Sequence, residues 1–178
     1  MKRSMKVAFG GVISALSLTA MFFTGVFPFA EYALPAIAGA LLAVLVIEFG
    51  FRAAFAAFGA VAVLSLVLTP NKEAVILFIA FLGYYPIVKG KLETLRARPL
   101  RWVLKFVLFN AAAAASYAVM IELLGMTEVM EDFAAFRFGA LGLLLLGNAV
   151  FWLYDVALTR VISLYVYQMR GKLQNRLH

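Results

Sequence analysis

The chain has 178 residues, 65% of them hydrophobic, and its 16 Lys and Arg against 9 Asp and Glu give a formal net charge of +7. This composition excludes an ordinary soluble domain, which needs far more polar surface. Cysteine is absent and the only histidine is His178, so disulfides, thiol catalysis and a metal centre held by Cys or His are not expected.

A helix needs about 20 mostly apolar residues to cross a membrane. Hydropathy and turn residues predict an all-α polytopic membrane protein, a six-helix bundle in a single transmembrane domain over residues 1–178. In chain order, the expected spans are about 7–27, 33–49, 51–69, 73–88, 100–124 and 134–165. The second and third spans meet at Gly50 in a close hairpin, and Pro70 and Asn71 mark the turn before the fourth.

The first span follows a basic start at Lys2, Arg3 and Lys6. This pattern resembles a signal peptide, but the apolar run is too long for one and no small-residue cleavage site ends it. We therefore expect the first span to be retained as a membrane helix.

Basic residues lie on one side of this pattern. With both termini in the cytoplasm, every Lys and Arg except Lys72 and Arg137 falls on the inner side. Cytoplasmic loops keep Lys and Arg, so this orientation is predicted for a multi-pass protein of the cell (inner or plasma) membrane. The basic loops would face anionic membrane lipid, which accounts for the positive charge without nucleic acid as a partner.

Polar residues inside the spans predict specific contacts, because an unpartnered polar group is costly in a membrane. Asn110 and Asn148 lie at comparable depth in the last two spans, and a hydrogen bond between them would join these helices. Asp155 lies in the inner third of the last span, where Lys105 or Arg160 would be its partner. A structural ion pair is the favoured reading of Asp155, and a proton-coupling role is the alternative.

Aromatic residues and a lysine end the fourth span. Tyr84, Tyr85 and Pro86, followed by Lys89, are typical of an interfacial belt with a lysine that extends to the membrane surface. Docking of a cytoplasmic partner is the alternative for this segment.

No catalytic constellation is recognisable in the sequence. A Ser/His/Asp set is missing because the lone histidine is His178, and no phosphate-binding P-loop occurs. Glu128, Glu131 and Asp132 are close together, but on an outer loop they are expected to be solvated. The chain is therefore expected not to be an enzyme and to hold no metal and no cofactor.

Small residues recur at helical spacing in the first span at Gly10, Gly11, Ser14 and Ala15. Such residues let helices approach closely, either within the bundle or against a partner. The stretch 7–17, Val-Ala-Phe-Gly-Gly-Val-Ile-Ser-Ala-Leu-Ser, and the six-span topology resemble the substrate-binding (S) components of energy-coupling factor (ECF) transporters. Segments 33–39 and 83–89 look like those of uncharacterised membrane proteins related to that group.

The resemblance implies a partner and a solute. In that family the small-residue face of the first helix contacts a transmembrane coupling subunit, and ATPases supply the energy, which gives the partner role here to Gly10, Gly11, Ser14 and Ala15. A small, vitamin-like solute would bind in the outer half, where the chain offers Phe29, Glu31, Tyr32, Asn71, Glu73, Tyr117 and Glu122.

The acidic outer side favours a neutral or cationic solute, although the acids there could simply be solvated. The alternative function is a non-transporting scaffold or assembly protein, similar to the rod-shape protein D group of cell-shape factors.

Overall fold

The computed structural model describes residues 3–123, 125 and 139–169. The described residues form helices and no strands. The α-helices are α1 (Arg3–Phe23), α2 (Ala33–Phe49), α3 (Phe51–Leu68), α4 (Lys72–Leu77), α5 (Tyr85–Glu93), α6 (Arg98–Ala118) and α8 (Gly139–Leu164). Pro28–Ala30 forms a short 3₁₀ helix, and three π-helical segments cover Phe78–Leu82, Val119–Leu123 and Tyr165–Met169.

Five helical segments are long and apolar enough to cross a membrane. They are Ser4–Phe23, Phe51–Leu68, Lys72–Glu93, Arg98–Glu122 and Leu141–Gln168. The helix α2 has 17 residues and is also apolar, but it is shorter. The described part of the chain is therefore all-helical and suited to a membrane, with five spans if α2 is too short to cross and six if α2 crosses as well.

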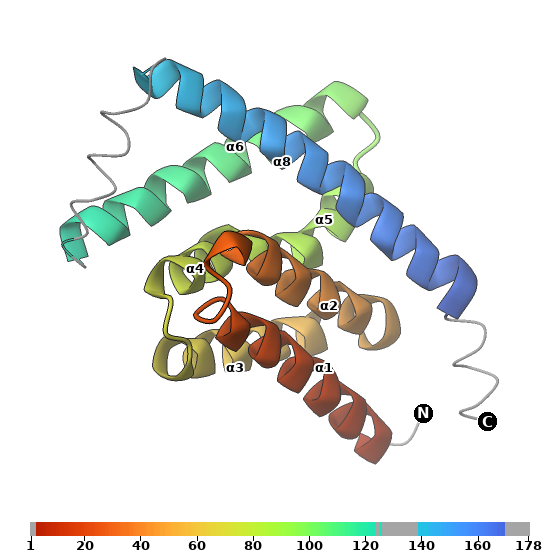
Figure 1. Ribbon diagram of the computed structural model, residues 1–178. Coiled ribbons are helices and arrows are strands. Elements are labelled where there is room, and N and C mark those ends of the chain that lie inside the picture. Colours follow the sequence, from red (N-terminus) through yellow and green to blue (C-terminus); the bar gives the residue numbers. More distant parts are fainter. Residues whose placement is uncertain (1–2, 124, 126–138, 170–178) are drawn as a thin grey trace.

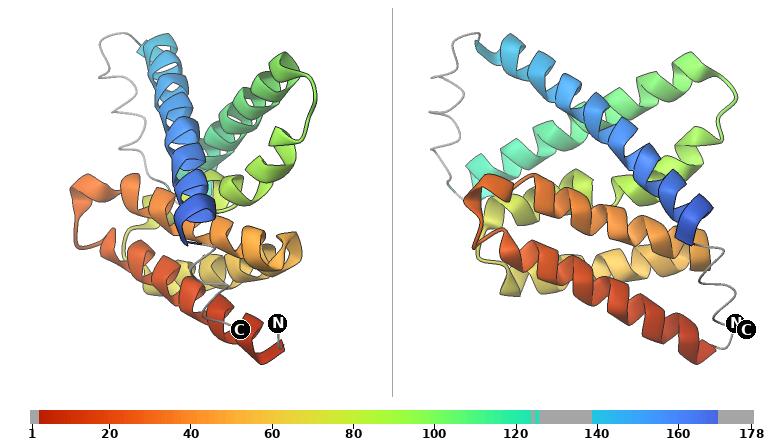
Figure 2. Two further views of the ribbon diagram at one scale, coloured as in Figure 1. Left: turned by 90° about the vertical axis from the view of Figure 1, so that its right-hand side faces the viewer. Right: turned by 45° about the vertical axis from the view of Figure 1, so that its right-hand side comes forward.

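The first three helices form one layer, and α6 and α8 cross each other on the other side of the fourth span (Figures 1 and 2). Gly50 joins α2 to α3 with φ of 85°, a backbone conformation that glycine adopts without steric cost. The hydroxyl of Ser17 on α1 donates to the carbonyl oxygen of Ala38 on α2 at 3.0 Å. This buried bond joins two helices whose small side chains let them lie close together.

The fourth span is bent. The π-helical segment Phe78–Leu82 and the turn at Gly83 and Tyr84 separate α4 from α5, and Pro86 occupies the first turn of α5. Proline is tolerated there because the first amide groups of a helix have no partner within it. The span expected at about 73–88 is thus two helices meeting at an angle, and the second helix continues to Glu93.

Two glycines allow close contact between the middle of the fourth span and the helices α2 and α3. A Cβ atom on Gly39 of α2 would lie 1.9 Å from the carbonyl oxygen of Leu82, and one on Gly83 would lie 2.6 Å from the Phe58 ring. No larger residue fits at Gly39 without displacing backbone. The close approach brings segments 33–39 and 83–89 together, and α5 leaves this point towards α6 and α8 (Figure 1).

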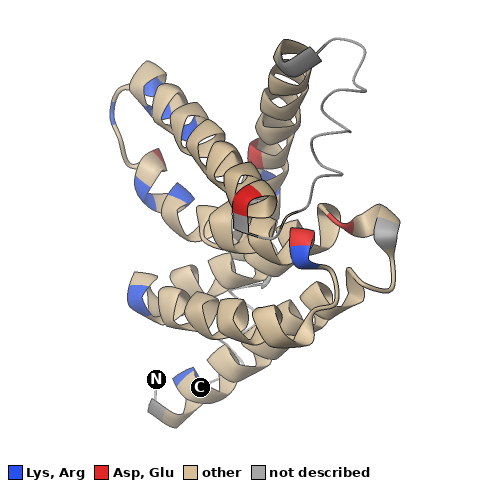
Figure 3. Cartoon of the chain, turned by 90° about the vertical axis from the view of Figure 1, so that its left-hand side faces the viewer, with Lys and Arg blue, Asp and Glu red and all other residues tan. Residues whose placement is uncertain are grey.

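Charge separates the two ends of the helices (Figure 3). Lys6, Arg52 and Arg98 lie at the end that holds the α2–α3 hairpin and the α5–α6 connection, called here the basic end. Glu31 and Glu73 lie at the opposite end, in or beside the α1–α2 and α3–α4 connections, called here the acidic end. The expected charge separation is therefore present in the fold.

Candidate functional site

Two polar clusters stand out, one at each end. The loop cluster lies at the acidic end and contains Glu31, Tyr32, Asn71, Glu73 and Tyr117. The Tyr32 hydroxyl donates to Glu73 Oε1 at 3.2 Å, and Asn71 Nδ2 donates to Glu31 Oε1 at 2.9 Å. Tyr117 of α6 lies close enough to Glu73 to be influenced by its charge. The structure thus brings together five of the seven residues predicted to bind a solute.

Local geometry explains how these side chains are held. Asn71 is the N-cap of α4, where its Oδ1 accepts from the backbone amide of Ala74 at 3.0 Å. The amide oxygen satisfies an orphan amide group of the helix, which leaves Nδ2 free to donate to Glu31. Lys72, the first residue of α4, donates to the carbonyl oxygens of Leu66 and Thr69 at the end of α3. The α3–α4 connection is therefore held at both helix ends.

Charge in the loop cluster affects Tyr32. The residue is largely exposed, but its hydroxyl lies against Glu73. Partial burial, and then the neighbouring carboxylate of Glu73, raise the pKa of Tyr32 above its usual range. The phenol therefore stays protonated and remains a donor across the physiological pH range.

The other predicted solute-site residues lie outside the loop cluster. Phe29 is 88% exposed in the α1–α2 connection. Glu122 is exposed on the π-helical segment that follows α6. The acidic residues Glu128, Glu131 and Asp132 lie outside the described residues, as does Arg137.

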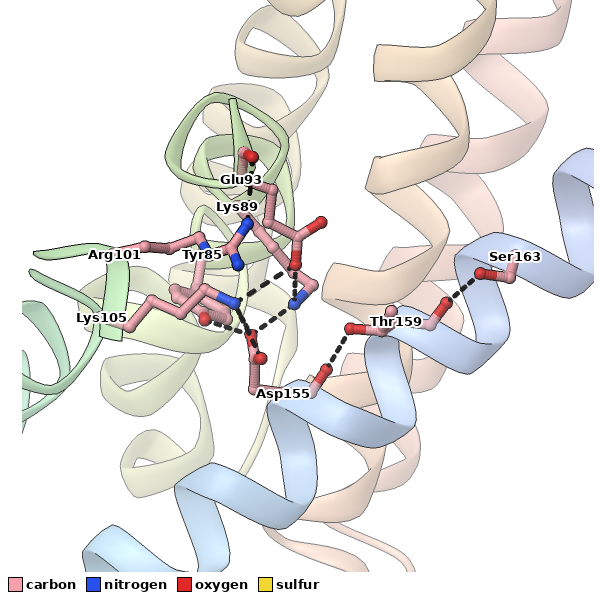
Figure 4. A network of polar contacts seen from close by, with 8 residues as sticks. All are labelled: Tyr85, Lys89, Glu93, Arg101, Lys105, Asp155, Thr159 and Ser163. Atoms are coloured by element: carbon pink, nitrogen blue, oxygen red, sulfur yellow. Dashed lines mark hydrogen bonds and ion pairs between the residues drawn. The ribbon is translucent and has the colours of Figure 1, made fainter. Parts of the chain in front are cut away.

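The buried ion cluster lies toward the basic end, inside the bundle, and contains Tyr85, Lys89, Glu93, Lys105 and Asp155 (Figure 4). Lys105 Nζ lies 2.8 Å from Asp155 Oδ2, and Lys89 Nζ and the Tyr85 hydroxyl both donate to Asp155 Oδ1. Glu93 accepts from Lys89 at 2.6 Å and from Lys105 at 3.2 Å. Two ammonium groups therefore face two carboxylates.

Burial distinguishes the members of this cluster. Lys89 is 1% exposed, while Lys105 and Asp155 are 3% exposed, and only the Glu93 side chain is partly open, at 38%. Isolated charges at such positions would be very costly, and pairing makes them tolerable. The cluster connects α5, α6 and α8 through one set of shared atoms.

The predicted ion pair of Asp155 is present with Lys105, while Arg160, the other proposed partner, makes no ion pair with it in the described part of the chain. The prediction that Lys89 extends to the membrane surface is wrong. Lys89 lies on α5, after the π-helical segment, and its side chain reaches inward to Asp155 (Figure 4). Two signals could have indicated this: Gly83 and Pro86 interrupt the span, and Glu93 lies four residues after Lys89.

Aromatic rings surround the buried ion cluster on its interior side. Phe81 stacks on Tyr85 with ring centroids 4.6 Å apart, and Phe109 stacks on Phe151 at 4.7 Å. Further towards the middle of α6 and α8, Asn110 Nδ2 donates to Asn148 Oδ1 at 2.8 Å, and Asn148 Nδ2 donates back at 3.1 Å. The predicted bond between the last two spans is therefore present, in reciprocal form.

A groove opens onto the buried ion cluster from the basic end. It has a volume of about 440 Å³ and is lined by Glu93, Arg101, Trp102, Lys105, Asp155, Val156, Thr159 and Arg160. We call it the inner groove. Its lining comes from the end of α5, the start of α6 and the second half of α8. Lys105 and Asp155 thus line a groove although little of either residue is exposed.

The small residues of α1 divide between two environments. Gly10 and Ser14 line a groove of about 300 Å³ shared with α2 and α3, whereas Gly11 and Ala15 are exposed. A Cβ atom on Gly10 or Gly11 would meet nothing within 4 Å. Internal packing therefore does not require either glycine.

Comparison with known proteins found no family model, no curated protein and no solved structure that matches this chain. The resemblance to the S components of ECF transporters therefore stays a prediction from the sequence.

Proposed function

We propose that this protein is the solute-binding membrane component of an uptake transporter that separate subunits energise, with six spans and both termini in the cytoplasm. The loop cluster is the observation that carries the proposal. Side chains from three distant parts of the chain meet there, with two carboxylates beside two phenol rings. Ligand sites of this kind combine aromatic surface with a few directed polar groups.

The chemistry of the loop cluster favours a small organic cation or a neutral amine-bearing solute. Glu31 and Glu73 supply negative charge, and the rings of Tyr32 and Tyr117 supply the electron-rich faces that attract cations. Asn71 fixes Glu31 in place through its hydrogen bond. A vitamin-like molecule with a positively charged nitrogen fits this arrangement.

A partner surface on α1 belongs to the same proposal. Gly11 and Ala15 are exposed, and no described side chain crowds Gly10 or Gly11. Gly11→Leu should therefore leave the purified protein folded while it blocks co-purification of a coupling subunit from the native membrane. If Gly11→Leu retains the same bound proteins as wild type, this face of α1 is not the coupling surface.

Binding of a solute panel tests the site directly. Purified protein would be mixed with vitamin-like amines and neutral vitamins, and binding would be measured by calorimetry. We expect Glu73→Gln and Tyr117→Ala to weaken the bound solute at least about tenfold, or roughly 1.4 kcal/mol. Glu48→Gln is the matched control, because it makes the same chemical change near the other end of the bundle. Unchanged affinity in both site variants would exclude the loop cluster as the site.

Orientation has a separate test, because the native chain has no cysteine. Leu95→Cys places a single thiol in the α5–α6 connection. An impermeant thiol reagent should label it only in inverted vesicles or broken cells. Labelling from outside intact cells would reverse the proposed topology.

A membrane scaffold is the second candidate, and the filled interior of the bundle favours it. Stacked rings from α6, α8 and the fourth span occupy the space beside the buried ion cluster. A scaffold needs a rigid bundle and no solute. Failure of the entire solute panel, together with co-purification of a stable protein partner, would support the scaffold over the transporter.

A further inference from the structure

We propose that the inner groove binds the phosphate headgroup of an anionic phospholipid. The groove lies where α5, α6 and α8 diverge, and its mouth carries Arg101 from the start of α6 and Arg160 from the end of α8. Both arginines lie toward the basic end of the molecule, and the predicted orientation places that end at the cytoplasmic leaflet. This leaflet contains the anionic lipids of the membrane.

Charge balance leaves the mouth of the groove positive. The ammonium groups of Lys89 and Lys105 are matched by the carboxylates of Glu93 and Asp155. Adding Arg101 and Arg160 gives four cations against two anions, a net charge of +2. The surplus charge therefore comes from the two arginines, both of which line the groove.

The two arginines also keep donors for a ligand. Arg101 donates from one terminal nitrogen to the backbone oxygen of Glu93 at 3.3 Å. Within the described part of the chain, Arg160 has no hydrogen-bond or ion-pair partner. Each guanidinium has five N–H donors in a planar fork that matches phosphate oxygens. Both line the inner groove, so each can donate to a phosphate bound there.

The apolar part of a lipid also has a place to lie. From the groove towards the middle of the membrane, Trp152 and Leu153 of α8 are 50% and 63% exposed. Because the basic end is placed at the cytoplasmic leaflet, a lipid with its phosphate at Arg160 would extend its acyl chains along this apolar surface. A soluble phosphate would use only the groove.

The experiment compares lipids on delipidated protein. The purified protein would be titrated with phosphatidylglycerol, with phosphatidylcholine and with soluble glycerol phosphate, and bound lipid would be counted by native mass spectrometry. We expect phosphatidylglycerol to bind at least about tenfold more tightly than phosphatidylcholine. We expect glycerol phosphate at the same concentration not to displace it.

Variants assign the binding to the groove. The double variant Arg101→Gln, Arg160→Gln should lower phosphatidylglycerol affinity at least about tenfold. The control is the double variant Arg52→Gln, Arg98→Gln, which removes the same charge at the same end and should leave the affinity within about twofold. Arg160→Gln alone should give part of the loss, and it keeps the test valid if the double variant fails to fold. Arg160→Lys should also weaken binding, because the planar fork is lost.

Three results would overturn the proposal. Equal loss in the control pair would show that general charge attracts the lipid. Undiminished phosphatidylglycerol binding in the groove variants would place the lipid elsewhere. Full competition by glycerol phosphate would show that the groove takes a free phosphate ester and not a membrane lipid.

Discussion

The buried ion cluster and the loop cluster use the same chemistry in different surroundings. In each, two carboxylates accept hydrogen bonds from neighbouring side chains. Asp155 and its two lysines are at most 3% exposed, whereas Tyr32 is 59% exposed. Breaking a buried ion pair costs about 3–5 kcal/mol, while an exposed pair contributes about 0.2–1 kcal/mol. The buried ion cluster is therefore needed for stability. The loop cluster contributes little to stability, so its side chains could bind a ligand instead of one another.

The difference follows from how each cluster is positioned. The loop cluster forms between connections at the helix ends, where water competes for every donor. The buried ion cluster forms because the bend at Gly83 directs α5 into the bundle. Little of Asp155 and its two lysines is exposed there, so their charges are paired within the protein.

The largest effect is expected at Asp155. The change Asp155→Asn leaves Lys89 and Lys105 buried with only Glu93 as a charged partner, so the free energy of unfolding should fall by about 3–5 kcal/mol. Denaturant titration of the purified protein in mixed micelles measures this. Glu122→Gln is the control, since this carboxylate is exposed. Replacing both lysines by Met together with Asp155→Leu should recover most of the lost stability. A loss below about 1 kcal/mol for Asp155→Asn would show that the buried ion cluster matters no more for stability than an exposed pair.

Gly39 should be nearly as sensitive, because it sets the bend that directs α5. A Cβ atom at this position would lie 1.9 Å from the Leu82 carbonyl oxygen, so Gly39→Ala should destabilise the protein by about 1–3 kcal/mol. Gly10→Ala is the matched control in another helix, where nothing lies within 4 Å, and alanine there should be neutral or stabilising. Equal stability of the two variants would show that α2 and the bend are not in tight contact.

The asparagine pair should have an intermediate effect. Asn110 and Asn148 exchange two hydrogen bonds between α6 and α8, and such bonds between membrane helices contribute about 0.6–2 kcal/mol. A double-mutant cycle with Asn110→Ala and Asn148→Ala isolates this coupling. Additive losses would mean that the two side chains stabilise their helices independently.

The smallest effect is expected at Tyr32, and it should depend on pH. Tyr32→Phe removes one exposed hydrogen bond to Glu73, so stability at neutral pH should change by less than about 1 kcal/mol. The folded state raises the pKa of Tyr32, so the hydroxyl is protonated in both states below about pH 10. Above that pH the unfolded chain loses the proton first, and the contribution of Tyr32 is lost.

Unfolding midpoints of wild type and Tyr32→Phe between pH 8 and pH 11 would measure this. The wild type should lose stability relative to the variant as pH rises above about 10. A constant difference over this range would show that the fold does not raise the pKa of Tyr32.

Much of this architecture follows from local rules. Apolar length predicts membrane helices, and polar residues placed in such helices predict the Asn110–Asn148 and Lys105–Asp155 contacts, because lipid offers them no alternative partner. The charge asymmetry predicts which connections share an end. In the loop cluster, the sequence indicates which residues are near the acidic end but not which of them touch.

The inward position of Lys89 could not be predicted from hydropathy. Its direction depends on a π-helical segment and a turn, and these form where Gly39 lets α2 press against Leu82. Average hydropathy is the same for a straight and a bent span. The inner groove has the same origin, because it exists only where α6 and α8 diverge around α5.

Sequence alone therefore determined that the protein is helical and suited to a membrane, since burial of the backbone in lipid allows little else for such long apolar segments. It also determined which polar groups must be paired. Only the tertiary structure decided that Tyr85 and Lys89 also meet Asp155, because this depends on how α5 follows the π-helical segment and on how α6 and α8 cross.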